Sequence, residues 1–164
     1  MITVEKYAGM DYPPNIAEID AVFNVANKPI LFAYGTRIYN PLRIDIPREL
    51  IAHEKVHGDR QITYLDPPMV ATPEVSIEAW WRRYLQDPEF RLVEELWAHR
   101  AEYQSLMKDG NRHITRKALL ETAKRLLNPL YGELPITLKM AKLIISADEA
   151  KAKRTIERRP QRND

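Results

Sequence analysis

The run His53-Glu54-Lys55-Val56-His57 constrains this chain more than any other stretch. On an α-helix, two histidines four residues apart project from one face, one above the other, so their ring nitrogens can share one metal ion. Glu54 follows the first histidine and leans over the same site, where it could accept a proton from a water molecule. A helix that begins near Pro47 is therefore predicted, and another element must bring a third ligand to it.

Composition limits the remaining possibilities. A chain of 164 residues, with 45% apolar and 29% charged residues, is typical of one globular domain with its own core. Cysteine is absent, which excludes a disulfide framework and a thiolate metal site. The net charge of +2 does not indicate nucleic acid as a partner. No signal peptide is visible and no apolar run approaches the roughly 20 residues of a membrane span, so we expect a cytosolic protein.

Apolar periodicity and turn residues predict a mostly helical domain of the α+β class. Helices are expected over residues 16–25, 74–86, 89–108, 115–127 and from 137 into the charged C-terminal segment. Strands over residues 30–34 and 37–40 are expected to form a hairpin around Gly35-Thr36, and residues 42–46 suit an edge strand or an extended lead-in.

The ends of the motif helix carry two further expectations. Asp45 can cap the helix, with Pro47 in its first turn. Gly58 directly follows the motif, and it could either end the helix or lie beneath a close neighbour.

The motif itself does not specify a third metal ligand. One class of enzyme with this motif has a third histidine six residues after the second, but Thr63 occupies that position here. His99 and His113 remain as histidine candidates.

A carboxylate on the helix predicted over residues 89–108 is the stronger candidate. Glu95, His99 and Glu102 lie at positions i, i+4 and i+7, so they share one face of that helix. Glu94 and Glu102 are the alternatives to Glu95. Two histidines and one glutamate would leave one coordination position open, which is the catalytic rather than the structural pattern of zinc sites.

The motif followed some tens of residues later by a helical glutamate resembles the gluzincin group of zinc metallopeptidases. A wider set of runs, spread over roughly residues 20–145, is similar to small metallopeptidases encoded by tailed bacteriophages and prophages. These runs are FAYG (32–35), IYNP (38–41), HEKVH (53–57) with Gln61, YLQDPEFR (84–91), ELWAH (95–99) and LYG (130–132).

The resemblance also bears on the third ligand. In that family the third-ligand glutamate is followed shortly afterwards by Ala and an aromatic residue, and Ala98 and His99 stand in those places. The resemblance therefore favours Glu95 over Glu94. His99 replaces the family's aromatic residue, which is a departure from the pattern.

The resemblance implies a zincin-like single domain over residues 1–150, with a small hairpin or sheet at about residues 30–46 beside the motif helix. Residues 151–164 would be a charged helix end or tail. The implied cofactor is Zn²⁺, held by His53, His57 and Glu95. If the chain is phage-encoded, the host cytoplasm is its expected location.

Roles for the other candidates follow from the chemistry of this class. Glu54 would act as general base and then as general acid. Developing negative charge on the scissile carbonyl oxygen usually needs a further hydrogen-bond donor, for which Tyr131, Tyr103 and His99 are candidates.

A substrate site is also expected along the second strand of the hairpin. There Arg37, Ile38 and Tyr39 could pair with an extended peptide as an added strand. The leading function is hydrolysis of peptide bonds in a protein or peptide. The alternatives are a non-catalytic binding or regulatory module and a hydrolase of a non-peptide amide, and the sequence does not indicate an oligomeric state.

Overall fold

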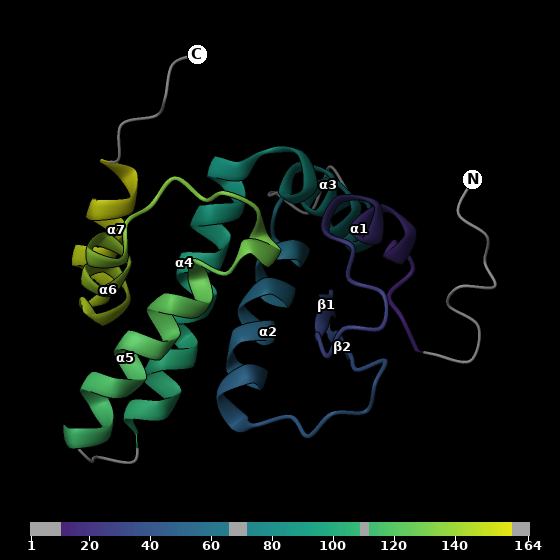
Figure 1. The fold of residues 1–164 in the computed structure, drawn as a ribbon. Coiled ribbons are helices and arrows are strands. Elements are labelled where there is room, and N and C mark those ends of the chain that lie inside the picture. The colour runs from purple at the N-terminus through teal and green to yellow at the C-terminus, as the bar shows by residue number, and fades with distance from the viewer. Residues whose placement is uncertain (1–10, 66–71, 109–111, 159–164) are drawn as a thin grey trace.

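The computed structural model describes residues 11–65, 72–108 and 112–158. This part of the chain folds into seven α-helices, a short 3₁₀ helix and one antiparallel hairpin (Figure 1). In chain order they are α1 (Ile16–Phe23), β1 (Phe32–Tyr34), β2 (Arg37–Tyr39), α2 (Arg48–Ile62), α3 (Pro73–Gln86), α4 (Pro88–Met107), α5 (Arg112–Leu126), η2 (Pro129–Tyr131), α6 (Leu138–Ser146) and α7 (Glu149–Glu157). The predicted class, a mostly helical α+β domain, is confirmed. None of the helices described is both long and apolar enough to cross a membrane.

Helices α2 and α4 lie side by side at the centre of the molecule (Figure 1). The hairpin and α3 pack against α2, whereas α5 and α6 pack against α4, and α7 packs against α6. The helix that carries the histidine motif is therefore covered by α4 on one side and by the hairpin on another. This arrangement buries His53 and His57.

Capping residues set the starts of α3 and α4. Thr72 and Asp87 are the N-caps, and each is followed by a proline in the first turn. An Oδ1 of Asp87 accepts hydrogen bonds from the backbone N–H groups of Glu89 and Phe90, both at 3.0 Å. A proline at the first helical position has no N–H of its own that would lack a partner, and its fixed φ suits a helix. Both helices therefore begin at these prolines.

The start of α2 differs from the prediction. Asp45 does not cap this helix, because Pro47 is the N-cap residue, with an extended backbone, and no side chain bonds to the first turn. A proline also pushes the residue before it out of the helical region. Asp45 therefore stands two residues too early to reach the first turn. Residues 42–46 form no strand and serve as the lead-in to α2.

The C-terminal region also differs, because the single helix predicted from residue 137 is two helices. Ala147 is extended, and Asp148 starts α7 by accepting a hydrogen bond from the backbone N–H of Lys151 at 2.8 Å. Ala152 and Ile156 of α7 are buried in the core. The first part of the charged C-terminal segment is thus an amphipathic helix that packs on the domain.

The hairpin turn has the predicted length. Tyr34 pairs with Arg37, so Gly35 and Thr36 form a two-residue loop. Gly35 has a φ of +58°, and it is the first central residue, where hairpin turns of type II′ place glycine. The turn brings the hairpin backbone back towards α2.

Gly58 is the point at which the hairpin meets α2. A Cβ atom on Gly58 would lie 2.1 Å from the carbonyl oxygen of Gly35. One turn later, the buried amide of Gln61 accepts a hydrogen bond from Gly35 N–H at 2.7 Å and donates one to the Ala33 carbonyl at 3.0 Å. Since α2 continues to Ile62, Gly58 permits a close approach and does not end the helix.

Two apolar clusters fill the interior on either side of the α2–α4 pair. We call the first the aliphatic cluster: Leu92, Leu96, Tyr103, Ala123, Leu126, Ala141, Ile144, Ile145, Ala152 and Ile156. We call the second the aromatic cluster: Ile16, Ile19, Val25, Phe32, Tyr39, Ile77, Trp80, Trp81 and Tyr84. The polar side chains described next lie between these clusters, on α2 and α4.

Candidate metal centre

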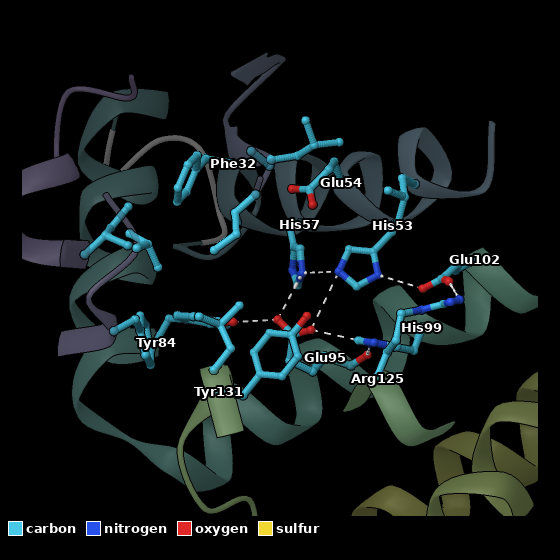
Figure 2. Close-up of a pocket in the computed structure, with 18 of the residues that line it drawn as sticks. Phe32, His53, Glu54, His57, Tyr84, Glu95, His99, Glu102, Arg125 and Tyr131 are labelled. Carbon is cyan, nitrogen blue, oxygen red and sulfur yellow. Dashed lines mark hydrogen bonds and ion pairs between the residues drawn. The ribbon is translucent and has the colours of Figure 1, made fainter. Parts of the chain in front are cut away.

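The two motif histidines point from α2 towards α4, as Figure 2 shows. Their side chains are buried, and their Nε2 atoms lie 3.2 Å apart. The rings meet edge to face, with centroids 4.9 Å apart. The spacing of four residues has therefore produced the shared face that the sequence predicts for His53 and His57.

Glu95 approaches both histidines from α4 (Figure 2). Its Oε1 lies 3.2 Å from Nε2 of His57, and its Oε2 lies 3.6 Å from Nε2 of His53. The side chain is only 1% exposed. Three potential ligand atoms thus converge from two helices.

These separations match what a tetrahedral ion requires. Ligand bonds of 2.0–2.2 Å at tetrahedral angles place neighbouring ligand atoms roughly 3.3–3.6 Å apart. His53, His57 and Glu95 form one buried group that could hold a metal ion. His53, His99 and Glu102 form a second, overlapping group. A possible buried metal site is thus present at the position predicted from the motif.

The two carboxylate oxygens of Glu95 have different surroundings. The hydroxyl of Tyr84 donates a hydrogen bond to Oε1 at 2.5 Å. Oε2 is buried and makes no hydrogen bond among the described residues, and the nitrogens nearest to it in ion-pair range are Nε2 of His53 at 3.6 Å and Nδ1 of His99 at 3.4 Å. A buried carboxylate oxygen without a hydrogen bond is costly unless something else satisfies it, and a metal ion would do so.

Glu94 does not face this site, although it adjoins Glu95. Arg60 binds it through two hydrogen bonds, of 2.5 and 2.6 Å, and the indole N–H of Trp80 donates to it at 3.1 Å. All of its charge is thereby paired away from the histidines. Of the alternatives for the third ligand, this geometry disfavours Glu94.

Glu102 lies on the far side of His53. Its Oε2 is 3.4 Å from Nδ1 of His53, and Arg125 of α5 pairs with its Oε1. The histidine ring is thus flanked by Glu95 at one nitrogen and by Glu102 at the other (Figure 2).

The proton of His99 is placed by a hydrogen bond within α4. Nδ1 of His99 lies 2.9 Å from the backbone carbonyl oxygen of Glu95, an acceptor, so this nitrogen carries the proton. Burial lowers the pKa of His99 to about 4, and the charge of His53 adds to this effect. His99 is therefore neutral, with Nε2 unprotonated.

Buried carboxylates make the centre attractive to cations. Burial, the largest influence, lowers the pKa of His53, but the contact with Glu102 and the charges of Glu95 and Glu54 outweigh it. The result is a pKa raised to about 9. Burial likewise raises the pKa of Glu95, yet the neighbouring histidines, His57 first, outweigh burial and hold this pKa well below its usual range. The negative potential of these carboxylates, which retains a proton on His53, would also attract a divalent cation.

Glu54 lines the cavity next to the histidines and is only partly exposed. Burial raises the pKa of its carboxyl group, while the charges of His53 and His57 act in the opposite direction. A raised pKa brings a carboxylate closer to the range in which it exchanges protons near neutral pH.

Tyr131 reaches the same cavity from η2, and its ring lies 6.0 Å from that of His99 (Figure 2). Its pKa is raised well above the usual value by burial and by the charges of Glu95 and Glu54. A hydrogen bond to Glu95 acts in the same direction, so the hydroxyl stays protonated.

The cavity has a volume of about 220 Å³ and extends from the histidines to the hairpin and α1. Phe32 and Ala33 of β1 line it, whereas Arg37, Ile38 and Tyr39 of β2 do not. β1 is thus the strand of the hairpin that borders this cavity, and the pairing of Arg37, Ile38 and Tyr39 with a substrate stays a prediction.

Two functional neighbours were not anticipated from the sequence. Tyr84 fits the apolar pattern of its helix, and only the folded chain brings its hydroxyl to Glu95. Arg125 gives no local signal, because its partner Glu102 lies 23 residues earlier on another helix. The side chain of His113 lies outside the described residues.

No protein-family model, curated protein or solved structure matches this chain. The function is therefore inferred from the geometry of the site itself.

Proposed function

We propose that the chain is a zinc-dependent metallopeptidase in which His53, His57 and Glu95 hold Zn²⁺. The observation that carries the proposal is the convergence of two buried imidazole nitrogens and the two carboxylate oxygens of Glu95, with separations of 3.2–3.6 Å. Two imidazole nitrogens and one carboxylate oxygen form a donor set that zinc accepts, and they leave one coordination position free for catalysis. Glu54 beside this set supports an enzyme over a binding module, which has no need of a proton acceptor there.

When bound, zinc would lower the pKa of a water molecule and polarise the scissile carbonyl. Glu54 takes the proton of the attacking water and delivers it to the departing amine. Its position on the cavity wall and its raised pKa suit both transfers.

Tyr131 is the better candidate to stabilise the developing oxyanion. Its protonated hydroxyl opens onto the cavity that Glu54 also lines. His99 is less suited, because the hydrogen bond of its Nδ1 to a backbone carbonyl leaves Nε2 without a proton to donate. Tyr84 instead holds the carboxylate of Glu95 in place.

The apolar part of the cavity favours a peptide with an apolar side chain near the cleaved bond. That wall is formed by Ile19, Phe23, Val25, Ile30, Leu31, Phe32, Leu50 and Leu130. The carboxylates at the other end disfavour an acidic side chain in the same place.

The test is Glu54→Gln, assayed with fluorescently labelled casein and with zinc content measured alongside. We expect a loss of roughly 10²–10⁴-fold in kcat with zinc retained, because the substitution removes the proton acceptor and leaves the ligands in place. Asp59→Asn is the matched control: it neutralises a solvent-exposed carboxylate on the same helix and should leave the rate unchanged. Cleavage that survives both Glu54→Gln and a chelator would contradict the proposal.

A further inference from the structure

Glu102 stands outside the set of three ligands, yet it contacts one of them. It lies on α4 seven residues after Glu95, on the same face of the helix. Nδ1 of His53 is buried, has no hydrogen-bond partner in the described chain, and lies 3.4 Å from Oε2 of Glu102. Since Nε2 of the same ring faces Glu95, Nδ1 is the nitrogen left for an orienting partner.

Glu102 is itself held by a second helix. Its side chain is 1% exposed, and Arg125 of α5 pairs with its Oε1. The same guanidinium nitrogen also lies 3.3 Å from the hydroxyl of Thr122. One carboxylate oxygen is thereby committed to Arg125, and the other is aimed at His53 (Figure 2).

We propose that Glu102, anchored by Arg125, is the positioning residue of His53. Its carboxylate accepts the Nδ1 proton, which fixes the ring orientation and leaves the lone pair of Nε2 directed at the metal. A carboxylate on the outer nitrogen also makes the imidazole a stronger ligand. The inference rests on the proposed metal site, and it adds α5 to the elements on which that site depends.

The competing interpretation treats His53, His99 and Glu102 as a metal site of their own. Two points count against it. The guanidinium of Arg125 already occupies one oxygen of Glu102, and a second cation nearby would be repelled. His53 would also have to lose both ring protons to serve two ions.

Glu94 offers a matched control on the same helix. It too is 1% exposed and paired with an arginine, Arg60, which is 39% exposed at its side chain against 47% for Arg125. Its remaining partner is the indole of Trp80, not a histidine. Glu94→Leu therefore removes the same charge and the same kind of ion pair without touching a metal ligand.

The experiment compares zinc affinity in the full chain, measured by competition with a chelating dye, for wild type, Glu102→Leu, Glu94→Leu and Arg125→Met. Glu102→Leu should weaken zinc binding roughly 10–100-fold, as loss of such carboxylate partners commonly does. Arg125→Met should produce a smaller loss in the same direction. Glu94→Leu should lower the melting temperature of the zinc-free chain and leave zinc affinity within about threefold, because Glu94 contacts no ligand directly and reaches His57 only through the ring of Trp80.

Several outcomes would overturn the inference. Wild-type affinity in both Glu102→Leu and Arg125→Met would do so, as would an equal loss in Glu94→Leu. If Glu102→Leu does not fold, Arg125→Met decides alone, because it alters a half-exposed side chain. Two zinc ions per wild-type chain would favour the second metal group. A wild-type chain that binds no zinc would refute the proposed function as well, whereas wild-type binding with unaffected variants refutes only this inference.

Discussion

The two sides of α4 differ in the residues they bury. The aliphatic cluster joins α4 to α5, α6 and α7, and Tyr103 is its only aromatic member among the described residues. The aromatic cluster joins α1, the hairpin and α3. Some of its rings stack, as Trp80 and Tyr84 do with centroids 4.7 Å apart, and others meet edge to face, as Trp80 and Trp81 do.

The two clusters therefore differ in role: the aliphatic cluster stabilises the fold, and the aromatic cluster contacts the residues of the candidate metal site. Aliphatic side chains interlock closely and carry no polar atoms, which suits a rigid base. Aromatic side chains bring polar atoms to buried positions: Tyr84 bonds Glu95, and Trp80 bonds Glu94 while its ring meets that of His57 at 5.6 Å. We therefore expect changes on the aromatic side to alter the metal site, and changes on the aliphatic side to alter stability alone.

The largest effect is expected from His57→Ala. Removing one of three ligands should weaken zinc binding by roughly a thousandfold or more and abolish zinc-dependent cleavage. The His57 ring is not part of the aliphatic cluster and packs against Trp80 and Tyr84, so the far-ultraviolet circular dichroism of the zinc-free chain should match that of wild type. Zinc content equal to wild type, measured on protein dialysed against zinc-free buffer, would refute the site and remove the basis of the comparison.

The next effect tests the aliphatic side. Ile144 is fully buried, so Ile144→Ala should lower the free energy of unfolding by about 2–5 kcal/mol through lost burial and the cavity left behind. Zinc affinity of the folded chain should not change. Met140→Ala, on the same helix but 38% exposed, is the control and should cost far less. Denaturant unfolding and dye competition measure the two quantities, and a parallel loss of zinc affinity would show that the two sides are not separate.

Local patterns in the sequence account for much of the fold. The caps Thr72 and Asp87 act through neighbours within three residues, so caps of this kind can be recognised in a sequence. The prediction that Asp45 caps α2 is wrong because the helix starts after Pro47. The predicted C-terminal helix is too long because the break at Ala147 carries no glycine or proline. Such breaks depend on how the next helix packs.

The candidate metal site is predictable only in part, for a similar reason. The shared face of His53 and His57 follows from helical periodicity alone. Adjacent glutamates on α4 point in different directions, but which of them meets α2 is decided by packing between helices. Glu94 pairs with Arg60, which lies 34 residues earlier in the chain, and no local sequence pattern predicts that pair. The choice of Glu95 came from a family resemblance, and its contacts with both histidines agree with that choice.

The smallest effect is expected from a pair of tyrosine substitutions. Each removes a single hydroxyl oxygen, one in the aromatic cluster and one in the aliphatic cluster. Tyr84→Phe deletes the hydroxyl that donates to Glu95 at 2.5 Å. The carboxylate then loses a charge-assisted hydrogen bond, which should destabilise the fold by about 1.5–3 kcal/mol. Zinc affinity should fall by up to about tenfold, since Glu95 is no longer held in place. Tyr103→Phe deletes the equivalent oxygen in the aliphatic cluster, which includes none of the three ligands, and should leave zinc affinity unchanged. Titration of both variants with zinc measures the contrast, and equal affinities would mean that the aromatic side supports the site no more closely than the aliphatic side does.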